Sequence, residues 1–121
     1  MRPERLYSTR MSRAGPEPLD ASRRLARTGR GDAIRMVRDH TDTPWIREGL
    51  RDGTAHAVVL GRHALPAWGA SSPWPCLVVH VTRAPVVYGE RALESWVAVY
   101  YDAEGEGRAQ VLSRCPESPR C

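Results

Sequence analysis

Apolar residues recur at helical spacing in the first half of the chain and in short runs in the second half. Ile34 and Val37, and then Ile46 and Leu50, are three or four positions apart, which puts each pair on one face of a helix. From residue 56 onward the apolar runs are short and rich in Val, a pattern typical of β-strands. Helices followed by strands predict an α+β fold.

The first two predicted helices are short. One begins at Leu19 and is ended by the glycine pair Gly29 and Gly31, because glycine readily takes the conformation that closes a helix. The next begins at Asp32, whose carboxylate is suited to accept a bond from a free backbone N–H at a helix start.

The third predicted helix has the clearest ends. Thr43 is a capping residue, and Pro44 suits the first helical position because its missing N–H has no partner to lose there. Gly53 supplies the stop. We therefore expect short N-terminal helices that pack on a sheet.

The second half predicts an antiparallel sheet of four to five strands. Residues 56–61 and 76–82 form the first strands, separated by a loop at 64–75 that is rich in proline. Residues 86–88 follow a proline and are expected as an edge segment or as a continuation after a bulge. Residues 96–113 have the pattern of a β-hairpin with a turn at 102–107.

The chain divides into three predicted parts. Residues 1–18 are expected to form a flexible basic arm, residues 19–114 a single α+β domain, and residues 115–121 a flexible C-terminal tail. No apolar run is long enough to cross a bilayer, and the N-terminus lacks the apolar core of a secretory signal. With three cysteines, which cannot all pair in one chain, these features favour a reducing, cytoplasmic location.

Positive charge is concentrated at the N-terminus. The 121 residues carry a net charge of +4, but residues 1–38 hold ten Arg against four acids, while the remaining residues have a net charge of −2. Lys is absent, as expected for a G+C-rich coding sequence of bacterial or phage origin. Such bias explains Arg in place of Lys but not the position of the charge. A segregated basic segment is typical of proteins that bind polyanions.

The candidate site is a group of six arginines in the first two predicted helices. Three of them recur at helical spacing, which predicts one basic stripe if residues 20–30 are a single helix. Such a stripe behind a basic arm is typical of phosphate-backbone binding. We therefore expect a small nucleic-acid-associated protein, regulatory or accessory, that binds DNA or RNA through Arg23, Arg24, Arg27, Arg30, Arg35 and Arg38.

Two alternative functions remain open. A ribonuclease-like or toxin-like enzyme of the small α+β type would use His56 or His80 with Glu90 or Glu94 and an arginine for acid and base chemistry. A protein-interaction module without catalytic activity would instead bind a protein partner through the tryptophans of the proline-rich loop, Trp68 and Trp74, and through an edge strand near Pro85.

We expect neither a metal nor a cofactor. Cys76 and His80 would face the same side of a strand but lie about 13 Å apart, too far to share one ion. The carboxylates at 102–107 do not follow the spacing of a calcium loop, and the glycine-rich and nucleophile motifs of common enzymes are missing.

Overall fold

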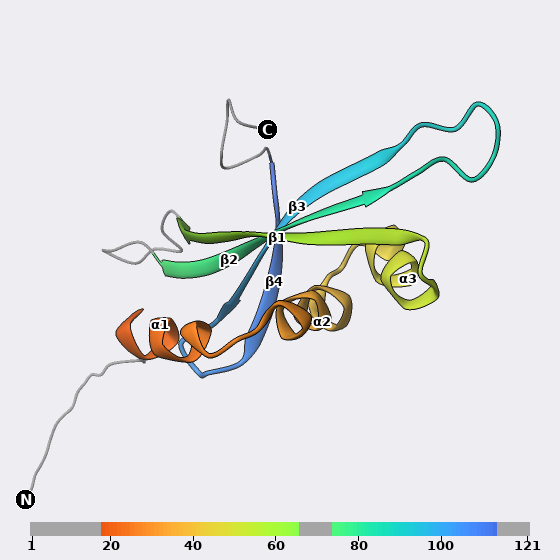
Figure 1. Cartoon of the computed structure of the whole chain (residues 1–121). Helices are drawn as coiled ribbons and strands as arrows, with labels where there is room; N and C mark the ends of the chain where they lie inside the picture. Colours follow the sequence, from red (N-terminus) through yellow and green to blue (C-terminus); the bar gives the residue numbers. More distant parts are fainter. Residues whose placement is uncertain (1–17, 66–73, 114–121) are drawn as a thin grey trace, which may run out of the picture.

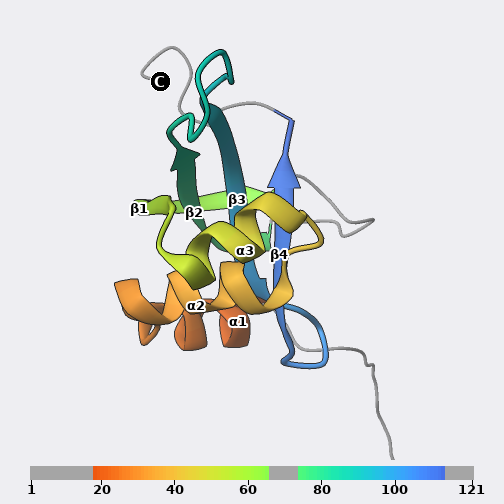
Figure 2. The same ribbon diagram turned by 90° about the vertical axis from the view of Figure 1, so that its right-hand side faces the viewer.

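The computed structural model describes residues 18–65 and 74–113. This part of the chain contains three helices followed by four strands: α1 (Pro18–Ala26), α2 (Arg30–His40), α3 (Pro44–Asp52), β1 (Ala55–Leu65), β2 (Trp74–Arg83), β3 (Leu93–Tyr101) and β4 (Gly107–Leu112). The helices lie on one side of the sheet in both views (Figures 1 and 2). The predicted α+β fold with an antiparallel sheet is confirmed.

Helix α3 has the predicted ends. Thr43 precedes the helix with an extended backbone, although its side chain makes no capping hydrogen bond, and Pro44 is the first helical residue. Gly53 ends the helix in the left-handed conformation, with φ of 83°. Left-handed backbone at this position favours glycine, which is why the sequence located this end correctly.

The boundary between α1 and α2 differs from the prediction. Helix α1 ends at Ala26, before the glycines, because the next two backbone N–H groups reach back only three residues to the carbonyls of Arg24 and Leu25. Helix α2 begins at Arg30 rather than at Asp32. The carboxylate of Asp32 lies inside the first turn, where it binds Arg35 instead of capping the helix.

The four strands form a sheet in the order β1-β2-β3-β4, with each neighbouring pair antiparallel. Val58, His80, Trp96 and Leu112 lie opposite one another in one row across the sheet. The register of β1 against β2 shifts between Val59 and Gly61, which forms a bulge. All strands therefore follow one another as a meander, and alternate residues face the helices.

The main core lies between the helices and the sheet. On this side β2 and β3 contribute four valines with no solvent exposure: Val79, Val81, Val97 and Val99. Each helix packs buried residues against them, among them Leu25 of α1, Val37 of α2 and Ile46 of α3. Burial of these side chains supplies the main favourable free energy of folding.

A smaller apolar cluster lies on the opposite face. Its buried strand residues are Trp74, Cys76, Val78 and Ala98, and Ala21 of α1, which contacts β2 and β3, belongs to the same cluster. Their positions on β2 and β3 alternate with those of the main core, as the sequence predicted for a strand buried on both faces.

Two predictions for the loops are wrong. Strand β1 extends to Leu65 and β2 starts at Trp74, so the loop predicted at 64–75 is shorter at both ends. Residues 86–88 form part of an exposed turn and not a strand. The Glu90 carboxylate accepts the backbone N–H groups of Val86 and Val87 at 2.8 and 3.1 Å, which replaces the bonds that a strand would make.

Parts of the chain expected to be mobile lie outside the described residues. These are the basic arm, except for Pro18, which begins α1, and the tail at 115–121. The division into arm, domain and tail stays a prediction. None of the helices within residues 18–65 and 74–113 combines the length and the apolar character needed to cross a membrane.

Candidate nucleic-acid interface

Helix α1 buries one side and exposes its arginines on the other. Ala21 and Leu25 are one turn apart and are 5% and 2% exposed. Because these two residues fix the buried side, the side chains of Arg23 and Arg24 point away from it, and both are exposed. Arg27 follows directly after the helix and is also exposed.

Arg24 is held against the β3–β4 hairpin. Its guanidinium lies over the ring of Tyr101, 4.1 Å from the centroid, and donates a hydrogen bond to the Gly105 carbonyl. Thr28 lies next to it, with its hydroxyl 3.0 Å from the Tyr101 hydroxyl. Both contacts attach the C-terminal end of α1 to the hairpin, so Arg24 has a structural role that the sequence did not indicate.

Three of the six predicted arginines form neither an ion pair nor a hydrogen bond through their side chains within the described residues. These are Arg23, Arg27 and Arg30, and all three are exposed. They do not form one helical stripe as predicted, because α1 ends at Ala26 and Arg30 starts α2. They instead follow one another along α1 and the short turn to α2. We call Arg23, Arg27 and Arg30 the unpaired arginines.

The last two predicted arginines have acidic neighbours on their own helix. Arg35 binds Asp32 at 2.6 Å, and Arg38 binds Asp39 at 2.9 Å. The hydrogen bond from Arg38 lowers the pKa of Asp39 and raises the pKa of Arg38. Exposed pairs of this kind stabilise the fold little, but they reduce the net positive charge of α2. The structure therefore separates the predicted set into paired and unpaired members.

One further arginine lies close to α1. Arg62 of β1 is exposed, and its guanidinium donates to the Ser22 hydroxyl at 2.5 Å. These residues are 40 positions apart in the chain, and Arg62 lies outside the basic N-terminal third. No local pattern could have assigned it to this surface, because only the packing of α1 against the sheet brings the two together.

In the turn between β3 and β4, the carboxylate of Asp102 binds groups of the hairpin itself. Asp102 accepts backbone N–H groups from Glu104 and Glu106 and binds Arg108 at 2.7 Å. Burial alone would raise the pKa of Asp102, but the bond from Arg108 and the backbone bonds outweigh it, and the pKa is lowered. A hairpin turn, as the sequence predicted, is confirmed.

The histidines of the enzymatic alternative lie on the face opposite the helices. His80 Nε2 is 3.0 Å from a Glu94 carboxylate oxygen, and its ring stacks on Trp96 with a centroid distance of 5.0 Å. His56 is exposed on β1, opposite Thr82. Glu90 lies in the turn after β2, where its carboxylate binds the backbone. Of the two acids considered, the structure thus brings only Glu94 to His80.

Trp74 belongs to the apolar cluster. It is 8% exposed, and its indole N–H donates to the Tyr101 carbonyl at 2.8 Å. A buried indole offers no exposed ring for stacking or for a partner. Trp68, the other tryptophan considered, lies outside the described residues.

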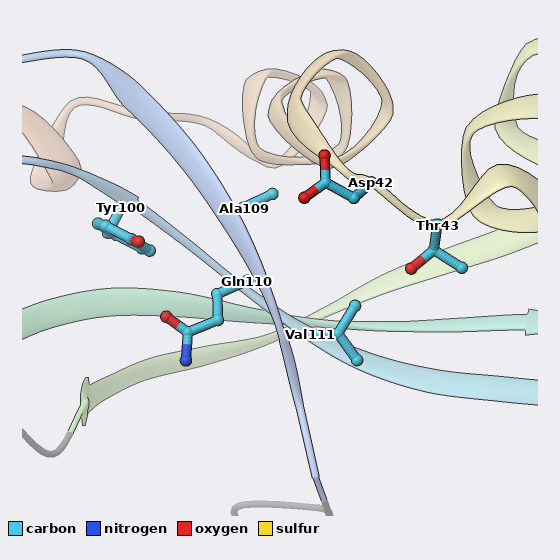
Figure 3. Close-up of a pocket in the computed structure, with 6 residues that line it drawn as sticks. All are labelled: Asp42, Thr43, Tyr100, Ala109, Gln110 and Val111. Carbon is cyan, nitrogen blue, oxygen red and sulfur yellow. The ribbon is translucent and has the colours of Figure 1, made fainter. Parts of the chain in front are cut away.

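A hollow of about 390 Å³ lies beside β4 (Figure 3). Its lining comes from the α2–α3 turn and from the last two strands: Asp42, Thr43, Tyr100, Ala109, Gln110 and Val111. Among the described residues no group of three or more His, Cys, Asp or Glu side chains is arranged to hold a metal ion.

Comparison of the chain with models of protein families, with curated proteins and with solved structures finds no match. The candidate site therefore rests on the geometry of this chain alone.

Proposed function

We propose that this protein binds the phosphate backbone of DNA or RNA through the unpaired arginines, as a cytoplasmic regulatory or accessory factor. The observation that carries the proposal is their lack of acidic partners within the described residues while they remain exposed. A guanidinium that already binds a carboxylate has to give up that bond to bind phosphate, whereas Arg23, Arg27 and Arg30 do not.

The neighbourhood of the unpaired arginines supports the same proposal. Arg24 and Arg62 are exposed beside α1, and both bind neutral groups, a carbonyl and a hydroxyl. Within the described residues, no ion pair to a carboxylate neutralises these two guanidiniums. Each phosphate that such a surface neutralises would release counterions, so that affinity would fall steeply with salt.

The test is a salt titration of binding to a duplex DNA and to a single-stranded RNA. The triple variant R23A/R27A/R30A removes the unpaired arginines. We expect the slope of log K against log salt on duplex DNA to fall by about 2 to 3, at about 0.9 for each phosphate that the variant no longer neutralises.

A matched control, R35A/R38A/R51A, removes three arginines from α2 and α3. It lowers the net charge by the same amount, and we expect it to change the slope by less than half as much. Equal changes of slope in the two variants would show that binding depends on net charge alone and not on the position of the unpaired arginines. Absent or salt-insensitive binding by the wild type would end the proposal.

A further inference from the structure

Strand β4 is one edge of the sheet, and some of its backbone groups make no hydrogen bond within residues 18–65 and 74–113. In antiparallel strands, directly opposed residues alternate between pairs that share hydrogen bonds and pairs that do not. Asp102 N–H donates to the Glu106 carbonyl at 2.9 Å, so this pair is of the bonded kind. The next pair, Tyr101 with Gly107, is then non-bonded.

This alternation continues along the hairpin, because the β3–β4 register has no bulge. Gly107, Ala109 and Val111 are therefore the residues of β4 whose N–H and C=O groups point away from β3. We call these groups the β4 edge. A strand of another chain can pair with the free backbone groups of an edge strand. Proteins commonly prevent such pairing with bulges, prolines or charges.

The two edges of the sheet differ in this protection. Strand β1 carries the bulge between Val59 and Gly61, where Gly61 has a φ of 141°, and this breaks the regular spacing of its outward groups. Strand β4 has neither a bulge nor a proline, and its single charged residue, Arg108, is paired with Asp102. Val111 is 45% exposed, although the residue opposite it, Val97, is completely buried.

We propose that the β4 edge pairs antiparallel with the β4 edge of a second copy of this chain, with a two-fold axis at Ala109. The three outward residues are spaced symmetrically about Ala109. Ala109 then faces its own copy, and Val111 of each chain faces Gly107 of the other. This register satisfies all outward groups of β4 and joins the two sheets into one.

The side chains fit this register. Arg108 lies opposite Gln110 of the second copy, so that no two like charges face each other. A shift centred on Arg108 would place two guanidiniums in contact and is disfavoured. The exposed Val111 would be covered by the second strand.

Polar residues also meet near the ends of the paired strands. A Cβ on Gly107 would lie 3.2 Å from His40 Nε2, so His40 lies beside that end of β4. Asp42 and Thr43 line the hollow next to Val111 (Figure 3). Because Val111 would face Gly107 of the other chain, Asp42 of one copy would lie near His40 of the other. The hollow would thus receive the second copy.

Sedimentation velocity over a concentration series tests this pairing, with a reducing agent and without nucleic acid. We expect the wild type to reach twice the chain mass. Ala109→Pro should leave only the monomer, because it removes the N–H at the centre of the pairing. That N–H makes no bond within the sheet, so the variant should keep its circular dichroism spectrum. The control Ala109→Val keeps the N–H and should still dimerise.

A second variant covers the case in which Ala109→Pro fails to fold. Val111→Lys places a charge on the edge and should also abolish the dimer while leaving the β3–β4 bonds intact. A wild type that stays monomeric up to its solubility limit would overturn the proposal. So would a dimer that survives Val111→Lys or a folded Ala109→Pro. Since no nucleic acid is present, the result is independent of the proposed function.

Discussion

The two faces of the sheet use neighbouring residues of the same strands but differ in what they bury. Facing the helices, Val79 and Val81 of β2 are completely buried. On the opposite face burial changes along the same strand: Cys76 and Val78 are 0% exposed, whereas the side chain of His80 is 26% exposed. Along β2, the face toward the helices is therefore buried from Leu77 to Val81, whereas the opposite face is buried at only one end.

This difference explains which side chains each face carries. A polar group without a partner is costly to bury, and the buried helix-facing positions Leu77, Val79 and Val81 of β2 are apolar. Where the opposite face meets water, it carries His80 and Glu94, which bind each other at 3.0 Å. Strand alternation thus determines which face a residue lies on, but coverage by other elements determines whether it is buried.

Truncation of one valine on each face gives the largest expected contrast. Val79→Ala should lower the free energy of unfolding by about 2 to 3 kcal/mol, because it removes buried methyl groups and leaves a cavity. Val58→Ala makes the same chemical change on the opposite face, where Val58 is 52% exposed, and should cost less than about 0.5 kcal/mol. Denaturant unfolding measures both values. Equal losses would contradict the contrast between the faces.

A glycine at the helix-covered side gives the next largest effect. A Cβ at Gly49 of α3 would lie 2.6 Å from the Cβ of Ala55, so Gly49→Ala must push α3 away from the start of β1. We expect a loss of about 1 to 2 kcal/mol.

The control for Gly49 is Gly31→Ala in α2. A Cβ at Gly31 has nothing within 4 Å, and alanine favours helix more than glycine does. This variant should be neutral or slightly stabilising in the same denaturant assay. If Gly49→Ala is equally well tolerated, α3 does not pack closely against Ala55 at the start of β1.

The smallest effect concerns the buried end of the opposite face. Burial raises the pKa of the Cys76 thiol to about 11, above its ordinary value of 9.0. Only the unfolded chain ionises this thiol readily near pH 9, so stability should fall as pH rises from about 9 toward 11. The fall should be about 1 kcal/mol or less up to pH 9.5.

Thermal unfolding between pH 8 and 9.5 detects this fall as a difference between the wild type and Cys76→Ala. The variant lacks the thiol and should show a shallower dependence on pH. Parallel curves would mean that the Cys76 thiol is accessible to water in the folded protein.

The sequence predicted helices and strands correctly where neighbouring residues determine their ends. The ends of α3 follow from Pro44 and Gly53, and the β3–β4 hairpin follows from two apolar runs around a turn rich in glycine. Prediction failed at Asp32, a good capping residue whose carboxylate is used by Arg35 inside the helix. It failed again at residues 86–88, where Glu90 binds the backbone of the turn.

The candidate site was only partly accessible from sequence. The sequence identified the basic segment, but it gave no reason to distinguish among the six arginines. The structure separates them, because Arg24 packs on Tyr101 whereas Arg35 and Arg38 bind acids on their own helix. Arg62 joins the surface of α1 through a contact that spans 40 residues. Such contacts depend on how the helices pack on the sheet, which no local pattern encodes.

The sequence by itself determined the order of helices and strands, the alternation of the strands and the position of the positive charge. These properties depend on neighbours a few residues apart, whose spacing the backbone geometry fixes. Only the tertiary structure decided which arginines lack acidic partners among the described residues, which end of the opposite face is buried and which sheet edge has no bulge. Each of these depends on groups that are distant in the chain and meet only when the helices and the sheet are packed together.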